Sequence, residues 1–156
     1  MKKLIFVFIF LQFNFASGQT DAEVRILNEL NSYRSKLGLP KVIYSAKLSN
    51  AARYQTKYYS MCKPADFIRT QHDQIFDFQD WEELSFSERC SKMWAEARID
   101  IVGEVASNGG WDDEKMIIQG FDESPAHRQI MRTRGEGQLL VGISNFQGYT
   151  VIDFGN

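Results

Sequence analysis

The stretch "LLVGISNFQGYTVIDFG", residues 139–155, decides the fold. It contains two apolar runs that are joined through Asn145–Gly148, and turn-forming residues between two such runs are typical of a β-hairpin. The sequence before the hairpin is mostly helical in pattern. Helices that precede a terminal hairpin predict an α+β fold, in which the helices pack on a small antiparallel sheet.

The helices are expected in four stretches upstream of residue 124. In the first, residues 20–40, Thr20 and Glu23 can form a capping box, and Gly38 and Pro40 end the helix. Apolar residues recur on one face of residues 45–62, which predicts a second helix. The remaining helices are expected at residues 85–97 and 112–121, the latter capped by Asp112 or Asp113. Residues 42–44 are expected to be a short extended link, and residues 101–111 a short extended piece followed by a turn.

Residues 1–18 have the pattern of a secretory signal peptide. A basic start at Lys2 and Lys3 precedes a short apolar run, and Ala16 and Gly18 are small residues suited to a cleavage site. An uncleaved anchor is the alternative. Residues 19–156 then form one domain of ordinary globular size, which we expect to be a soluble monomer that is secreted or periplasmic.

The charge of the chain argues against nonspecific nucleic-acid binding. The formal net charge is −2, and removal of Lys2 and Lys3 makes the mature chain more acidic still. Binding to phosphate backbones depends on an excess of positive charge, so no nucleic-acid partner is expected.

The two cysteines, Cys62 and Cys90, predict one disulfide, because disulfides persist in exported proteins. Two free, buried thiols are the alternative.

The stretch "SPAHRQIM", residues 124–131, contains one of the two histidines of the chain. Pro125 suits the first position of a helix, which makes Ser124 the N-cap, with its hydroxyl accepting from the N–H of Ala126 or His127. Neutral His127, in the first helical turn, could accept a hydrogen bond or bind a metal. Arg128 is expected to face solvent or pair with a carboxylate. A serine hydrolase is disfavoured, because no G-x-S-x-G elbow is present.

The order of these motifs resembles the CAP superfamily, which is also called the SCP/TAPS or PR-1-like family, in its bacterial form. The opening "LNELNSYRSKLGLPKVIYSAKLSNAARYQ" is similar to the start of that family, and "H…GE…SPAHR…VGIS…FG" is similar to its later motifs. The likeness covers about residues 24–155. It departs from the family at Val105, where "G-E-N" has asparagine, and at Phe121, where tryptophan is usual. Where animal and plant members carry a second glutamate, this chain has Ser124 with Glu123 beside it.

The resemblance implies a three-layer α-β-α sandwich with a central cleft. The cleft residues it implies are His72, Glu104 and His127, with Ser124, Glu123 and Arg128 nearby. Two imidazoles and a carboxylate could hold a divalent metal such as zinc, with a fourth position open. The alternative is a buried His–Glu hydrogen-bond network that only ties loops to helices.

Three functional hypotheses follow from these residues. The first is a non-enzymatic extracellular binding module for a lipid, a glycan or a protein. The second is a metal-dependent hydrolase, of protease or esterase type, using the same cleft, and the third is a purely structural secreted protein. A set of aromatic residues could line a groove for a lipid or glycan, or simply fill the core: Tyr54, Tyr58, Tyr59, Phe67, Phe76, Phe78, Trp81 and Trp94.

Overall fold

The computed structural model describes residues 19–61, 85–107 and 113–156. The predicted signal peptide therefore lies outside the described residues. The helices are α1 (Asp21–Lys36), α2 (Ala46–Met61), α4 (Phe86–Ala97), α5 (Glu114–Glu123) and α6 (Pro125–Met131). The strands are β1 (Ile43–Tyr44), β2 (Ile101–Ser107), β3 (Leu140–Phe146) and β4 (Tyr149–Gly155).

Helix starts follow the predicted caps. Thr20 and Glu23 form the predicted capping box, and Asp113 caps α5 by accepting from the N–H of Lys115. A second capping box, Ser85 with Glu88, starts α4. At Gly38 the backbone takes φ +65°, a left-handed conformation that glycine adopts without strain, and it ends α1.

The sheet has four strands in the order β1-β3-β4-β2. The predicted hairpin forms its centre, with β3 and β4 joined by a two-residue turn at Gln147 and Gly148, both at positive φ. β2, which the sequence indicates as a short extended piece, adds on antiparallel to β4. β1, which the sequence indicates only as an extended link, pairs with β3 in parallel.

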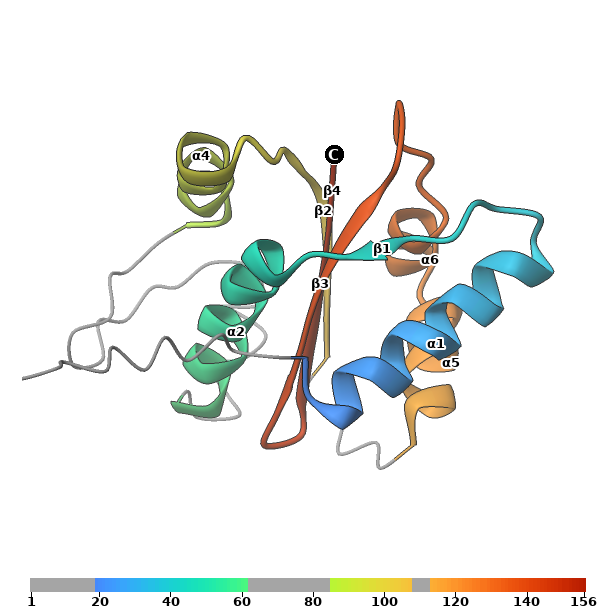
Figure 1. Ribbon diagram of the computed structural model, residues 1–156. Helices are drawn as coiled ribbons and strands as arrows, with labels where there is room; N and C mark the ends of the chain where they lie inside the picture. Colours follow the sequence, from blue (N-terminus) through green and yellow to red (C-terminus); the bar gives the residue numbers. More distant parts are fainter. Residues whose placement is uncertain (1–18, 62–84, 108–112) are drawn as a thin grey trace, which may run out of the picture.

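Helices cover both faces of the sheet and give the α-β-α sandwich (Figure 1). α1, α5 and α6 lie on one face, where the largest cluster of buried apolar side chains sits. It includes Ile26, Phe121, Met131, Val105 and Ile152. This face is almost purely hydrophobic, and its burial supplies most of the driving force for folding.

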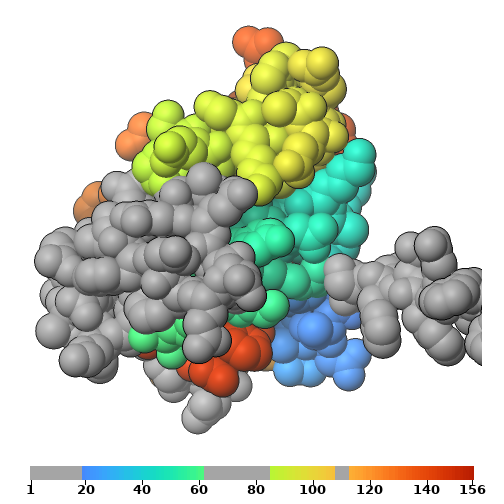
Figure 2. Space-filling model, turned by 90° about the vertical axis from the view of Figure 1, so that its left-hand side faces the viewer, coloured from blue at the N-terminus to red at the C-terminus, as the bar shows by residue number. Residues whose placement is uncertain are grey.

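The opposite face, covered by α2 and α4, is mixed in polarity. α2 lies directly on the sheet, because a Cβ on Gly142 would come within 2.3 Å of the Leu48 carbonyl carbon. Ser49 accepts a hydrogen bond from the N–H of Ile143 at 3.0 Å, and the hydroxyls of Thr56 and Ser144 are 2.7 Å apart. Figure 2 shows this face, with α4 beside α2. Polar side chains therefore converge here between helix and sheet.

The "N-x-x-R" motif of α1, Asn31 and Arg34, fixes the corner between the helix and β1. Asn31 exchanges two hydrogen bonds with the backbone of Val42. The Arg34 guanidinium is 1% exposed and donates to the carbonyls of Pro40, Met131 and Thr133 at 2.9, 2.6 and 3.1 Å. The motif is thus a structural device that joins three segments.

Candidate functional site

Glu104 lies on β2, on the face covered by α2 and α4. Its side chain is 1% exposed and forms an ion pair with Arg89 of α4, whose side chain is 3% exposed. Both carboxylate oxygens accept from this guanidinium, Oε2 at 2.7 Å and Oε1 at 3.2 Å. Such a two-bond pair is the strong form of an arginine–carboxylate contact. Burial is the largest single influence and opposes the charge on Arg89, but the charge and hydrogen bonds of Glu104, together with the neighbouring Asp153 and Tyr59, outweigh it and raise the pKa of Arg89.

Asp153 lies beside this pair and completes a buried charge cluster of Arg89, Glu104 and Asp153. It stands opposite Glu104 in the ladder between β2 and β4 and is 0% exposed. Neither carboxyl oxygen has a partner within ordinary hydrogen-bond geometry in the part of the chain that the structure describes. Burial raises the pKa of Asp153 well above its usual value, and the neighbouring charge of Glu104 raises it further. One guanidinium thus stands against two carboxyl groups, and burial favours the protonated form of Asp153.

Tyr59 of α2 lies next to the buried charge cluster. It is fully buried, and burial raises the pKa of its hydroxyl, as does the negative charge of Glu104. Its ring packs against Tyr149 with the ring centroids 5.9 Å apart. The cluster therefore has a hydrophobic cover and sits in a medium where charge interactions are strong.

Because Asp153 is ionisable, it should make the stability of the chain depend on pH. Its pKa is raised in the folded chain above 3.8, so folded protein holds the proton to a higher pH than unfolded protein. This contribution is complete below the unfolded pKa and is lost as the pH rises through the folded pKa. The Asp153→Asn variant cannot ionise at this position. The difference between its melting temperature and that of the wild type should therefore shift in favour of the variant as the pH is raised from about 4.5 to 9.

Thermal melts across this range check the expectation, with Glu96→Gln as the control, because Glu96 is an exposed carboxylate on α4. The control should show no such trend. A difference between Asp153→Asn and the wild type that stays constant with pH would contradict a raised pKa at Asp153.

His127 lies on the other side of the sheet from Glu104. It is half-buried on α6, with its ring edge-on to Phe121 and 5.3 Å between ring centroids. α6 packs on the face towards which Gly103 points, since a Cβ there would lie 2.7 Å from Cγ2 of Ile130. Side chains alternate along a strand, so Glu104 points the opposite way. The structure does not bring these two predicted cleft residues together.

The residues around His127 have local structural roles. Pro125 starts α6 and Ser124 is its N-cap, as predicted, but the Ser124 hydroxyl makes no capping hydrogen bond, so that part of the prediction is wrong. Ser124 instead lies between two helices, because it also ends α5, and its carbonyl accepts from the N–H of Arg128. Glu123 accepts from Gln119 at 3.0 Å. Arg128 pairs with Asp122 at 3.4 Å, as expected for an arginine near a carboxylate.

The remaining predicted site residues are only partly covered. His72 and Cys62 lie outside the described residues. Cys90 is a half-buried free thiol on α4, and its pKa is raised by burial. The disulfide therefore stays a prediction. Within residues 19–61, 85–107 and 113–156, no three His, Cys, Asp or Glu side chains are grouped so that they could hold a metal ion.

The predicted aromatic set divides by environment. Tyr58 and Tyr59 are core residues, whereas Tyr54 is 58% exposed and Trp94 is 46% exposed. Tyr54 and Trp94 lie on the two helices of the polar face. Phe67, Phe76, Phe78 and Trp81 lie outside the described residues.

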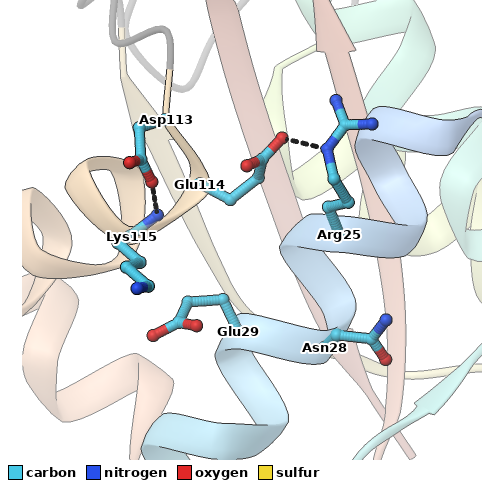
Figure 3. A pocket seen from close by; sticks show the side chains of 6 residues that line it. All are labelled: Arg25, Asn28, Glu29, Asp113, Glu114 and Lys115. Atoms are coloured by element: carbon cyan, nitrogen blue, oxygen red, sulfur yellow. Dashed lines mark hydrogen bonds and ion pairs between the residues drawn. The ribbon is translucent and has the colours of Figure 1, made fainter.

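A polar hollow of about 480 Å³ opens between α1 and the start of α5 (Figure 3). Arg25 donates to Glu114 across it at 2.6 Å, and this hydrogen bond lowers the pKa of Glu114. Its lining carries two basic and three acidic side chains, of which Arg25 pairs with Glu114 and Asp113 caps the start of α5. The ion pair between Arg25 and Glu114 therefore joins α1 to α5 across the hollow. The residues that line the hollow are Arg25, Asn28, Glu29, Asp113, Glu114 and Lys115.

Known proteins share the sequence motifs and the fold described above. A family model described as "CAP: Cysteine-rich secretory protein family" matches residues 27–134. This chain belongs to the CAP family. The match spans the "N-x-x-R" corner, Glu104 on β2 and α6, whereas the "VGIS" and "FG" motifs of β3 and β4 lie beyond it.

Solved structures with the same fold come from bacteria. An outer surface protein of Borrelia burgdorferi shares 13% identity with this CAP domain at a TM-score of 0.58, covering 89% of this chain and 95% of its own. A cysteine-rich secretory protein of Staphylococcus aureus shares 11% at 0.59, covering 90% of this chain and 40% of its own. An extracellular SCP-domain protein of Bacillus anthracis shares 15% at 0.53, covering 84% and 39%.

These structural similarities confirm the predicted fold. At sequence identities this low they show a shared fold and nothing about function. The CAP domain described here spans less than half of the staphylococcal and Bacillus chains. A comparison with curated proteins found no match. Among the described residues, no helix is long and apolar enough to span a bilayer.

Proposed function

We propose that this chain is an exported CAP-family binding module, which acts outside the cytoplasm by holding a ligand or partner and not by hydrolysis at Glu104. The supporting observation is the state of the Glu104 carboxylate. Both of its oxygens are taken up by Arg89, and the pair is almost fully buried. A general base or a zinc ligand must reach the reacting atom, and a carboxylate that is buried and held by a guanidinium is poorly placed to do so, so this geometry favours a structural task for Glu104.

Zinc held jointly by Glu104 and His127 is not part of this proposal. The two side chains point to opposite faces of the sheet, and a shared metal would have to lie within bonding distance of both. Binding in this proposal takes place on the outer surface, and the charge cluster fixes α2 and α4 to the sheet beneath it. The sequence predicts a lipid, a glycan or a protein as the ligand, and binding at the outer surface admits a polyanion as well.

The test is a native mass spectrum of the protein as its own producing cells secrete it, together with turnover assays on a panel of peptides and esters. We expect a non-covalent adduct and no hydrolysis. Glu104→Gln and His127→Ala should leave the assays unchanged, with Gln129→Ala as the control for a change on the same helix. Hydrolysis by the wild type that both Glu104→Gln and His127→Ala abolish, and that Gln129→Ala keeps, would show an enzyme instead.

A further inference from the structure

Two segments of this acidic protein contain no acidic residue at all. Residues 30–42 and residues 124–135 each carry three arginine or lysine residues and neither Asp nor Glu. The whole chain nevertheless has a net charge of −2. These two stretches lie far apart in the sequence, and the first belongs to a longer run, residues 30–65, that contains seven arginine or lysine residues and neither Asp nor Glu.

The fold brings these two stretches together where α1 and α6 end. Buried Arg34 donates to Pro40 in the first segment and to Met131 and Thr133 in the second. Arg134 lies close enough that its charge adds to burial in lowering the pKa of Arg34. The side chain of Gln138 also donates to the Lys41 carbonyl at 3.0 Å. We call the exposed cations here the cationic end: Lys36, Lys41, Arg132 and Arg134.

The charge of the cationic end is only partly compensated. Asp122 pairs with Arg132 at 3.0 Å and also with Arg128, so one carboxylate serves two guanidinium groups. Among the described residues, Lys36, Lys41 and Arg134 form no ion pair, and Glu136 is the exposed acid nearest to them in sequence. The carboxyl ends of α1 and α6 contribute about half a negative charge each at most. Several positive charges remain.

We propose that the cationic end is a binding surface for a polyphosphate chain. The inference rests on the proposed binding function and supplies the chemistry of the partner. Arginine and lysine are the side chains that recognise phosphate, arginine through its two-bond fork. The exposed cations come from two separate backbone segments, so a chain of anions can reach more of them than one small anion can.

The apolar side chains at this end do not favour a membrane surface as the partner. Of residues 30–42 and 124–135, only Leu37 is a large apolar side chain that is exposed at the ends of α1 and α6, at 42%. Proteins that lie in a lipid interface bury a broader apolar face. Ile43, just beyond Lys41, adds a second exposed apolar side chain at 51%, but the surface remains mainly ionic, and its binding should weaken steeply with salt.

The test is the affinity of the folded protein for fluorescently labelled long-chain polyphosphate, measured by anisotropy at several salt concentrations. The triple variant Lys36→Glu/Lys41→Glu/Arg134→Glu reverses the three charges that form no ion pair. Arg132 is left unchanged, because it also donates a hydrogen bond to the Tyr33 hydroxyl. The control, Lys47→Glu/Lys57→Glu/Lys115→Glu, has the same net charge, with its changes on exposed lysines of α2 and α5. Circular dichroism shows whether both triple variants remain folded.

We expect the wild type to bind, the first triple variant to lose roughly tenfold or more in affinity with a shallower salt dependence, and the control to bind nearly as well as the wild type. Equal losses in both triple variants would overturn the proposal, because binding would then reflect net charge alone. Competition by inorganic phosphate at low concentration, or binding only to phosphatidylglycerol vesicles, would also overturn it. If polyphosphate does not bind but the secreted protein carries another adduct, this inference fails and the binding function stands.

Discussion

Arg89→Met will lower the free energy of unfolding by about 3–5 kcal/mol, the usual cost of removing one partner from a buried ion pair. The guanidinium is the one positive charge in the buried charge cluster, and it faces Glu104 and Asp153 under a hydrophobic cover. It is also one of only two buried side chains of α4, the other being Met93. Without it, a carboxylate remains buried and α4 keeps little that holds it to the sheet.

The measurement is chemical denaturation at neutral pH, with Lys92→Met as the control for an exposed cation on the same helix. Glu104→Gln should cost less than Arg89→Met, because Asp153 can then release its proton and become the counter-ion of Arg89. Equal losses in the two variants would show that Asp153 does not take over. A loss below about 1 kcal/mol in Arg89→Met would mean that the pair is solvated and not buried.

Arg34→Met should lower the free energy of unfolding by about 3–4 kcal/mol. The change removes charge-assisted hydrogen bonds to three carbonyl groups and leaves those buried acceptors without a donor. Arg34→Lys should recover only part of the loss, since a compact ammonium group cannot reach three carbonyls that the planar guanidinium spans.

Denaturation curves for both variants check this expectation, and Arg25→Met is the matched control. Arg25 lies on the same helix, but its side chain is 58% exposed and its ion pair with Glu114 is a surface contact. Its replacement should change stability by less than about 1 kcal/mol. If Arg34→Lys were as stable as the wild type, the charge at this corner would matter and the shape of the guanidinium would not.

Local sequence signals predict most of the fold. Capping residues such as Thr20 and Asp113 mark helix starts because each satisfies backbone N–H groups that the helix leaves unpaired. The hairpin is equally local, with its turn residues between two apolar runs. β1 is missed as a strand, because two residues show no periodicity and its partner, β3, lies almost a hundred residues away.

The candidate site is predicted less completely, because it depends on which face each residue occupies. The family resemblance identifies Glu104, but nothing in the sequence says that α6 covers Gly103 and α4 covers Glu104. Arg89 is missed, since a basic residue on a short helix is ordinarily on the surface. Asp153 does carry a signal: an acidic residue inside the apolar run of β4, a central strand, has to be buried.

The order of strands in the sheet also has a consequence for how the chain acquires its structure. The two central strands, β3 and β4, come last in the sequence, while the edge strands β1 and β2 come earlier. During synthesis, neither edge strand has a neighbour to pair with until residues 140–155 have emerged. Folding then requires contacts between distant parts of the sequence and should be slow. A nascent chain of this kind cannot complete its sheet until its last strands are made, which suits the passage across a membrane that residues 1–18 predict.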